Sequence, residues 1–200
     1  MVKVKICGLS RPSDIEVVNT ERPDFIGFVF AKSKRRVTLP QAVDLRKMLS
    51  SDIIPVGVFV NESIENILSL TQEGIIDAIQ LHGSEDELYI QKLRLLTDAP
   101  IIKAISIHNK GDAQKWSATS ADYLLLDHKG GGTGQSFDWD MIGKINKPFF
   151  LAGGLNAENI AKAIQKTMPN AVDVSSGVET EGIKDPIKIK EFIRRVRDEQ

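Results

Sequence analysis

Two side chains near the ends of β-rich segments could exchange protons with a substrate. Cys7 follows the segment VKVKI at residues 2–6, and Asp127 ends the segment YLLLD at residues 123–127. A thiolate and a carboxylic acid that face each other across a cavity could take a proton from carbon and give one to oxygen. A lone cysteine also suits a small buried core position, so composition alone leaves both roles open for Cys7.

Glycine-rich turns in the last third of the chain could bind a phosphate group. LAGGLN at residues 151–156 and DVSSGVE at residues 173–179 each follow a β-rich segment. Glycine lets the backbone approach an anion closely, so that several N–H groups can converge on it. Either turn alone could serve only to reverse the chain, but their joint position favours a phosphate. The residues expected to bind it are Gly153, Gly154, Ser175, Ser176 and Gly177.

Basic residues and a histidine could complete such a site. The run after the second β-rich segment contains Lys32, Lys34, Arg35 and Arg36. Arginine offers a planar bidentate fork to a substrate carboxylate, although a solvated loop would have the same composition. His82, in the motif QLHG, could bind a ligand, orient a neighbour, act as an acid or be a hydrogen-bonded spectator.

The elements that must position these residues alternate along the chain. Strands are predicted at residues 2–6, 25–30, 53–60, 77–81, 100–105, 123–127, 148–152 and 171–175. Helices are predicted at residues 12–20, 40–49, 63–73, 85–96, 111–116, 138–145, 157–167 and 186–197. Strict alternation implies a parallel sheet, and eight repeats in a chain of this size favour a closed (β/α)8 barrel. The glycine-rich segment 130–134 predicts a mobile cover or a close approach to a ligand.

Side-chain parity predicts which residues point into the barrel. Successive strand residues face opposite sides, and we interpret the apolar face as the one that meets the helices. The residues then expected inside are Lys5, Cys7, Gln80, His82, Lys103, Asp127, Asp173 and Ser175. Most lie near strand C-termini, where the active sites of this fold are found. Lys5, Lys103 and Asp173 could instead form interior ion pairs that only fill the barrel, because buried charge is costly unless matched.

Composition narrows the classes of partner. The 26 Lys+Arg and 27 Asp+Glu residues nearly balance, so neither nucleic acid nor a membrane surface is an expected partner. We expect one domain over residues 1–200, located in the cytoplasm, since no signal peptide is recognisable and the longest apolar stretch, residues 53–60, cannot span a bilayer. The single cysteine rules out an internal disulfide, and no Cys/His cluster has zinc spacing. The residues thus give no indication of a zinc site.

Taken together, the motifs resemble those of phosphoribosylanthranilate isomerases, a family of ribulose-phosphate-binding (β/α)8 barrels. The resemblance runs through the chain in order and on the expected strands. Its segments are KICGL (5–9), GFVF (27–30), SKRRV (33–37), VGVFVN (56–61), QLHG (80–83), LLLDHKGGGTGQSFDW (124–139), LAGGLN (151–156) and DVSSGVE (173–179).

The resemblance implies an isomerase of tryptophan biosynthesis that carries out an Amadori rearrangement of N-(5'-phosphoribosyl)anthranilate. It implies that Asp127 is the general acid that protonates the furanose ring oxygen and that Cys7 is the base that removes the C2' proton. Arg35 would bind the anthranilate carboxylate, His82 and Asp173 would line the sugar site, and the two glycine turns would bind the phosphate. No cofactor is implied, because the anthranilate nitrogen supplies the electron sink.

Several points stay open at this stage. A base that works near neutrality needs a thiol pKa below its ordinary value of about 8.5, and Lys5 is a candidate for lowering the pKa of Cys7. An indoleglycerol-phosphate synthase-like barrel enzyme remains an alternative on the strength of Lys5 and Lys103, as does a non-catalytic sensor of phosphorylated metabolites. The expected partner is a phosphorylated small molecule, and the chain could be a monomer or a homodimer.

Overall fold

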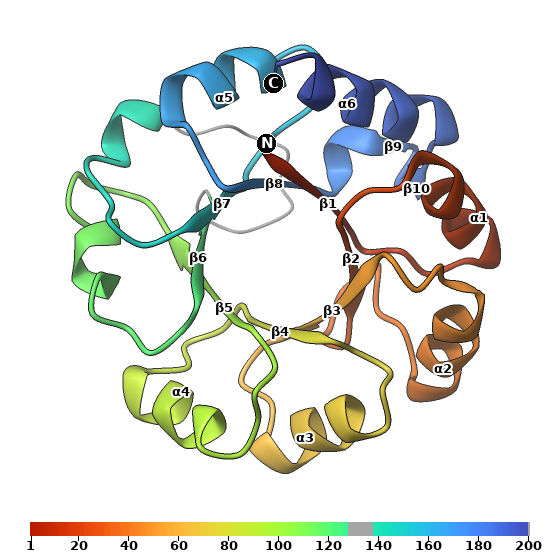
Figure 1. The fold of residues 1–200 in the computed structure, drawn as a ribbon, viewed down its shortest axis with the longest axis horizontal. Helices are drawn as coiled ribbons and strands as arrows, with labels where there is room; N and C mark the ends of the chain where they lie inside the picture. The colour runs from red at the N-terminus through yellow and green to blue at the C-terminus, as the bar shows by residue number, and fades with distance from the viewer. Residues whose placement is uncertain (128–137, 200) are drawn as a thin grey trace.

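A computed structural model describes residues 1–127 and 138–199, and it shows a closed barrel of eight parallel strands (Figure 1). The glycine-rich segment 130–134 lies outside the described residues. The strands are β1 (Lys3–Cys7), β2 (Phe25–Val29), β3 (Ile54–Phe59), β4 (Ala78–Leu81), β5 (Ile101–Ser106), β6 (Tyr123–Asp127), β7 (Phe149–Leu151) and β8 (Ala171–Val174). They follow one another in chain order around the barrel, and β1 closes the ring by pairing with β8. The predicted (β/α)8 barrel is confirmed.

Helices surround the barrel as an outer ring (Figure 1). The α-helices are α1 (Pro12–Glu21), α2 (Leu39–Met48), α3 (Ile64–Gln72), α4 (Glu87–Arg94), α5 (Ile160–Thr167) and α6 (Pro186–Asp198). Several begin where a side-chain oxygen accepts a hydrogen bond from a backbone N–H of the first turn, as Thr38, Ser63 and Asp86 do. No helix in the described part of the chain is long and apolar enough to cross a membrane.

The fifth and sixth predicted helices are single 3-10 turns, η1 (Ala113–Trp116) and η2 (Trp139–Met141). After η1 the chain runs into Ser and Thr residues at 117–120, whose side chains compete with helical hydrogen bonds. After η2, Gly143 adopts a φ of 66°, a left-handed conformation that ends a helix. The expectation of full helices at residues 111–116 and 138–145 was therefore wrong in length.

A small antiparallel hairpin after β8 was not predicted. It follows the 3-10 turn η3 (Ser176–Val178) and consists of β9 (Glu179–Thr180) and β10 (Ile183–Lys184). The two connecting residues, Glu181 and Gly182, have φ values of 52° and 80°. Positive φ at both central positions is the signature of the tight hairpin turn that matches strand twist. The hairpin lies next to the C-terminal end of β8 and brings charged side chains to the rim.

Two apolar layers separate the inside of the barrel from the helix shell. The inner layer consists of strand residues and Ala152, which directly follows β7: Phe25, Val56, Ala78, Ile102, Ala104, Leu125, Phe150, Ala152 and Ala171. Within it the ring of Phe150 meets Phe25 and Tyr123 edge-on, with centroids 5.4 Å and 5.5 Å apart. The outer layer joins the other face of the strands to the helices. The polar residues Lys5, Gln80 and Asp173 lie beyond this layer, toward the strand C-termini.

Lys103 does not point into the barrel, contrary to the parity prediction. In the sheet it pairs with Leu81 of β4 and Leu124 of β6, and both leucines belong to the outer layer. Its ammonium donates hydrogen bonds to Glu85 Oε2 at 2.8 Å and to the carbonyl of Gly83 at 2.7 Å. Apolar residues occupy both faces of β5, so the position of Lys103 did not indicate which face points into the barrel.

The buried Lys103–Glu85 ion pair should contribute strongly to stability. Both side chains are almost fully buried, so replacing Lys103 with methionine leaves an unmatched carboxylate in the protein. We expect Lys103→Met to lower the free energy of unfolding by about 3 to 5 kcal/mol, measured by urea titration. Lys92→Met, at an exposed position of α4, should change it by no more than about 0.5 kcal/mol. A loss below about 1 kcal/mol for Lys103→Met would contradict the buried pair.

Candidate active site

A cavity of about 440 Å³ opens at the C-terminal ends of the strands. It is lined by Cys7, Val29, Ala31, Lys32, Ser33, Arg35, Val58, Val60, Gln80, His82, Ser106, Asp127, Asp173 and Ser175. The structure therefore brings together six of the predicted site residues from strands that are distant in sequence. The described residues contain no group of three or more His, Cys, Asp or Glu side chains arranged to hold a metal ion.

Cys7 ends β1 with its thiol packed against the backbone of β2. A Cβ placed on Gly27 would lie 2.6 Å from the Cys7 sulfur, so only glycine at that position leaves room for the thiol. Burial raises the pKa of Cys7, and Asp173 adds to the rise, whereas Lys5 and Lys184 oppose it. The expectation that Lys5 brings this pKa below its ordinary value is thus wrong for the free protein, because desolvation of the thiolate outweighs the nearby cations.

Lys5 lies at the centre of the polar layer and is fully buried. Its ammonium donates to Gln80 Oε1 at 2.8 Å and to Asp173 Oδ1 at 3.0 Å, so β1, β4 and β8 are joined across the barrel. Burial lowers the pKa of Lys5, but the charges of Asp173 and Cys7 outweigh burial and raise it above its ordinary value. The interior ion pair considered for Lys5 and Asp173 is present, and Asp173 also lines the cavity.

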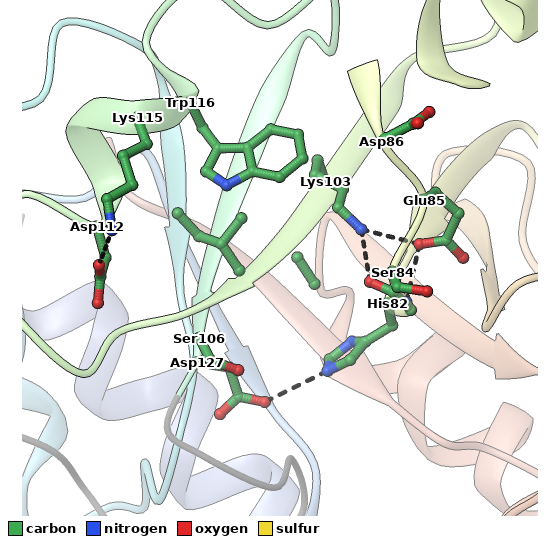
Figure 2. A pocket seen from close by; sticks show the side chains of 13 residues that line it. His82, Ser84, Glu85, Asp86, Lys103, Ser106, Asp112, Lys115, Trp116 and Asp127 are labelled. Atoms are coloured by element: carbon green, nitrogen blue, oxygen red, sulfur yellow. Dashed lines mark hydrogen bonds and ion pairs between the residues drawn. The ribbon is translucent and has the colours of Figure 1, made fainter. Parts of the chain in front are cut away.

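His82 and Asp127 approach each other on the opposite side of the cavity. The Nε2 atom of His82 is 3.6 Å from Oδ2 of Asp127, and Figure 2 shows the two side chains pointing toward one another. The other ring nitrogen of His82, Nδ1, is 2.8 Å from Nε2 of Gln80. His82 thus has a defined neighbour at each ring nitrogen.

Arg35 is held by a residue that the sequence did not single out. Its Nε and Nη2 atoms donate to the two carboxylate oxygens of Glu179, at 2.6 Å and 2.8 Å. Glu179 begins β9, and it also accepts a hydrogen bond from the buried Lys184 of β10 at 2.6 Å. The stem of Arg35 crosses Gly8, whose φ is +83° and where a Cβ would lie 2.5 Å from the Arg35 side chain. Arg36 is exposed and does not line the cavity.

The two glycine turns lie side by side at the rim. Gly153 and Gly154 have φ values of 84° and 64°, and a Cβ on Gly177 would come within 1.8 Å of the carbonyl oxygen of Leu155. The backbone of η3 therefore touches the loop after β7, as the pairing of β7 with β8 requires. The hydroxyl of Ser175 donates to the carbonyl of Cys7 at 3.0 Å, which ties the turn to the end of β1.

A second cavity of about 340 Å³ adjoins the first between the loops after β4 and β5 and the end of β6 (Figure 2). His82, Ser106 and Asp127 line both cavities. Trp116 forms part of its wall, with the Lys103 ammonium 5.7 Å from the ring centroid. Asp127 therefore lies where the two cavities meet.

Comparisons with known proteins agree over the whole chain. The family model described as N-(5'-phosphoribosyl)anthranilate (PRA) isomerase matches residues 4–195. A relative from Endomicrobium trichonymphae with that enzyme's name is 47% identical over 201 residues, which cover 98% of this chain and 99% of the relative. A phosphoribosyl anthranilate isomerase in complex with reduced 1-(o-carboxyphenylamino)-1-deoxyribulose 5-phosphate superimposes with a TM-score of 0.84 at 35% identity, covering 99% and 100% of the two chains. The structure of monomers generated from the dimeric Thermotoga maritima enzyme superimposes with a TM-score of 0.87 at 36% identity, covering 99% of this chain and 100% of that chain.

Because burial raises the pKa of Cys7, its thiol should react with iodoacetamide only at higher pH than an ordinary thiol. The thiolate is the reacting form, so a raised pKa moves the midpoint of the rate against pH upward. The chain unfolded in urea is the control, and its midpoint should lie at about 8.5. As Cys7 is the only cysteine, labelling is followed by intact mass. A folded-state midpoint at or below that of the unfolded chain would contradict the effect of burial.

Proposed function

The chain belongs to the N-(5'-phosphoribosyl)anthranilate isomerase family, and on that premise we propose that the cavity lined by Cys7, Arg35 and Asp127 is its active site. The protein is an isomerase of tryptophan biosynthesis. It converts N-(5'-phosphoribosyl)anthranilate to 1-(2-carboxyphenylamino)-1-deoxyribulose 5-phosphate by an Amadori rearrangement. The observation that carries the assignment of residues is that a thiol from β1 and a carboxyl group from β6 line one cavity at the strand C-termini.

Asp127 acts as the general acid. Its carboxyl group gives a proton to the furanose ring oxygen, the bond between C1' and that oxygen breaks, and the anthranilate nitrogen shares its electron pair to form a protonated Schiff base. Asp127 lies at the end of β6, three strands from β1 around the barrel, and lines the same cavity as Cys7, which supports this role. A second wall that includes Ser106 and His82 gives the carboxyl group polar surroundings.

Cys7 acts as the general base and removes the proton from C2'. The electron pair of the C–H bond moves toward the Schiff base and produces an enolamine, which tautomerises to the product ketone. The raised pKa of Cys7 makes its thiolate a stronger base once formed. Lys5 and Lys184 supply the positive charge that favours that thiolate.

Arg35 and the glycine turns bind the two anionic ends of the substrate. Glu179 engages only the edge of the Arg35 guanidinium formed by Nε and Nη2, so the N–H groups of Nη1 are left for the anthranilate carboxylate. The turns at Gly153–Gly154 and Ser175–Ser176–Gly177 bind the phosphate through backbone N–H groups. His82 and Asp173 line the sugar site between these ends.

The alternative of a synthase-like enzyme rested on Lys5 and Lys103. Lys103 faces the helix shell and pairs with Glu85, so it does not support that alternative. We further infer a cytoplasmic enzyme of one domain over residues 1–200 that acts on a phosphorylated small molecule, as a monomer or a homodimer. A relative described as dimeric supports the dimer, and the near-balanced charge argues against nucleic acid as a partner.

Removing either proton-transfer group should lower kcat far more than it changes KM. Cys7→Ala and Asp127→Asn are each expected to lose about 10² to 10⁴-fold in kcat, the range of general acid-base catalysis. The measurement is the decrease of phosphoribosylanthranilate fluorescence on adding purified protein with EDTA present, with the unmodified chain as control. Effects confined to KM in both variants would mean that these residues bind substrate and do not transfer protons.

Arg35 and its neighbour Arg36 form a matched pair for testing the carboxylate site. Charge-assisted hydrogen bonds contribute about 1.5 to 3 kcal/mol, so Arg35→Ala should cost roughly tenfold to a hundredfold in kcat/KM, mostly through KM. Glu179 keeps Lys184 as a partner in this variant, which protects the hairpin. Arg36→Ala should change kcat/KM by only about twofold to threefold, because its side chain is exposed. A larger loss for Arg36→Ala would show that the wrong arginine was assigned.

A further inference from the structure

Gln80 links the buried ammonium of Lys5 to the histidine beside Asp127. It lies in β4 and is 1% exposed. Its Oε1 accepts a hydrogen bond from Lys5 Nζ at 2.8 Å, and its Nε2 is 2.8 Å from Nδ1 of His82. The side-chain amide of Gln80 therefore contacts an ammonium group at one end and an imidazole ring at the other, and these contacts limit its orientation.

The contact with Lys5 determines which way the amide faces. An ammonium group has three donors and no acceptor, so the atom of Gln80 next to Lys5 must be the oxygen. The amide nitrogen then faces His82, and an amide nitrogen can only donate. Nδ1 of His82 must accept that hydrogen bond, which requires that it carry no proton.

The neutral imidazole of His82 consequently carries its proton on Nε2, the atom 3.6 Å from Asp127 Oδ2. In this tautomer Nε2 can donate to the carboxylate but cannot accept from the carboxylic acid. The opposite tautomer would turn a lone pair toward Asp127. Because an imidazole nitrogen is a stronger base than a carboxylate oxygen, that lone pair would take the proton that the acid needs.

We propose that Gln80 is a positioning residue that holds His82 as its Nε2–H tautomer and so keeps the catalytic proton on Asp127. Lys5 is the anchor that prevents the amide from turning over. This inference rests on the proposed role of Asp127 as general acid. When the carboxyl proton moves to the ring oxygen and the C1'–O bond breaks, the Nε2–H donates to the carboxylate that remains, which favours the transfer.

The tautomer is measured directly by ¹⁵N NMR of histidine-labelled protein. The chain has three histidines, and His82→Gln identifies the signal of His82 by its loss. We expect a proton on Nε2 and none on Nδ1 in the unmodified chain. Gln80→Glu turns a carboxylate oxygen toward Nδ1 and should place a proton there. A proton on Nδ1 in the unmodified chain, or an unprotonated Nδ1 in Gln80→Glu, would overturn the proposal.

A double-mutant cycle tests the consequence for turnover. When Nδ1 of His82 carries a proton, the ring is either the neutral tautomer with a lone pair on Nε2 or the imidazolium. Either form draws the proton away from Asp127. Gln80→Glu should therefore lower kcat by about tenfold or more with little change in KM. In the His82→Gln background, which has no tautomers, adding Gln80→Glu should change kcat by less than about twofold. An equal loss in both backgrounds would show that Gln80 acts through packing and would refute the proposal.

Two further variants separate the remaining outcomes. Methionine has a volume similar to that of glutamine and cannot donate to Nδ1, so Gln80→Met should give a mixture of His82 tautomers and a smaller loss of kcat than Gln80→Glu. This variant replaces Gln80→Glu if the latter fails to fold. Full turnover by Asp127→Asn would refute the acid assignment while the NMR result on His82 stands. If Gln80→Glu changes the His82 tautomer without lowering kcat, while Asp127→Asn is inactive, only the role proposed for Gln80 is refuted.

Discussion

The active site is organised around one buried positive charge, the ammonium group of Lys5. A lysine that is fully buried must have its charge matched and its donors hydrogen-bonded, or it would lose its proton or unfold the barrel. Asp173 from β8 supplies the charge, and Gln80 from β4 supplies a carbonyl oxygen. These contacts fix three strands relative to one another at the height of the cavity floor. The packed aromatic and aliphatic layer below them closes the barrel to water.

A second group of charges organises the rim. The β9–β10 hairpin carries Glu179 and Lys184, and Glu179 bridges that hairpin to Arg35 in the loop after β2. Lys184 also donates to the carbonyl of Ser175, whose hydroxyl donates to the carbonyl of Cys7. Burial lowers the pKa of Lys184, and the hydrogen bond and charge of Glu179 oppose that shift. Arg35 is thus oriented before substrate arrives, which reduces the entropic cost of binding.

The sequence predicted the barrel and most of the cavity because several strands have one polar and one apolar face. Lys5, Cys7, Gln80 and Asp173 could be placed inside from parity alone, and the structure agrees. The same rule failed for Lys103 because β5 carries apolar residues on both faces, and its partner Glu85 comes from the loop after β4.

Glu179 was visible in the motif DVSSGVE, yet its partner Arg35 is 144 residues away. No local pattern indicates such a contact, whereas the Glu-Gly pair at residues 181–182 was a usable signal for the hairpin that positions Glu179. The sequence could therefore predict the chemistry available at each strand end, but not which charges neutralise one another. That depends on the closure of the barrel, which brings β1 beside β8 and the loop after β2 beside the hairpin.

Burial of Cys7 has a consequence for how acid and base work together. Desolvation opposes loss of the Cys7 proton, so the proposed base depends on nearby positive charge to form its thiolate. Lys5 and Lys184 supply that charge, and in the arrangement proposed above the Nε2–H of His82 faces the carboxyl group of Asp127. The two sides of the cavity thus share one anchor, Lys5, whose charge favours the thiolate of Cys7 and whose hydrogen bond orients Gln80 beside His82.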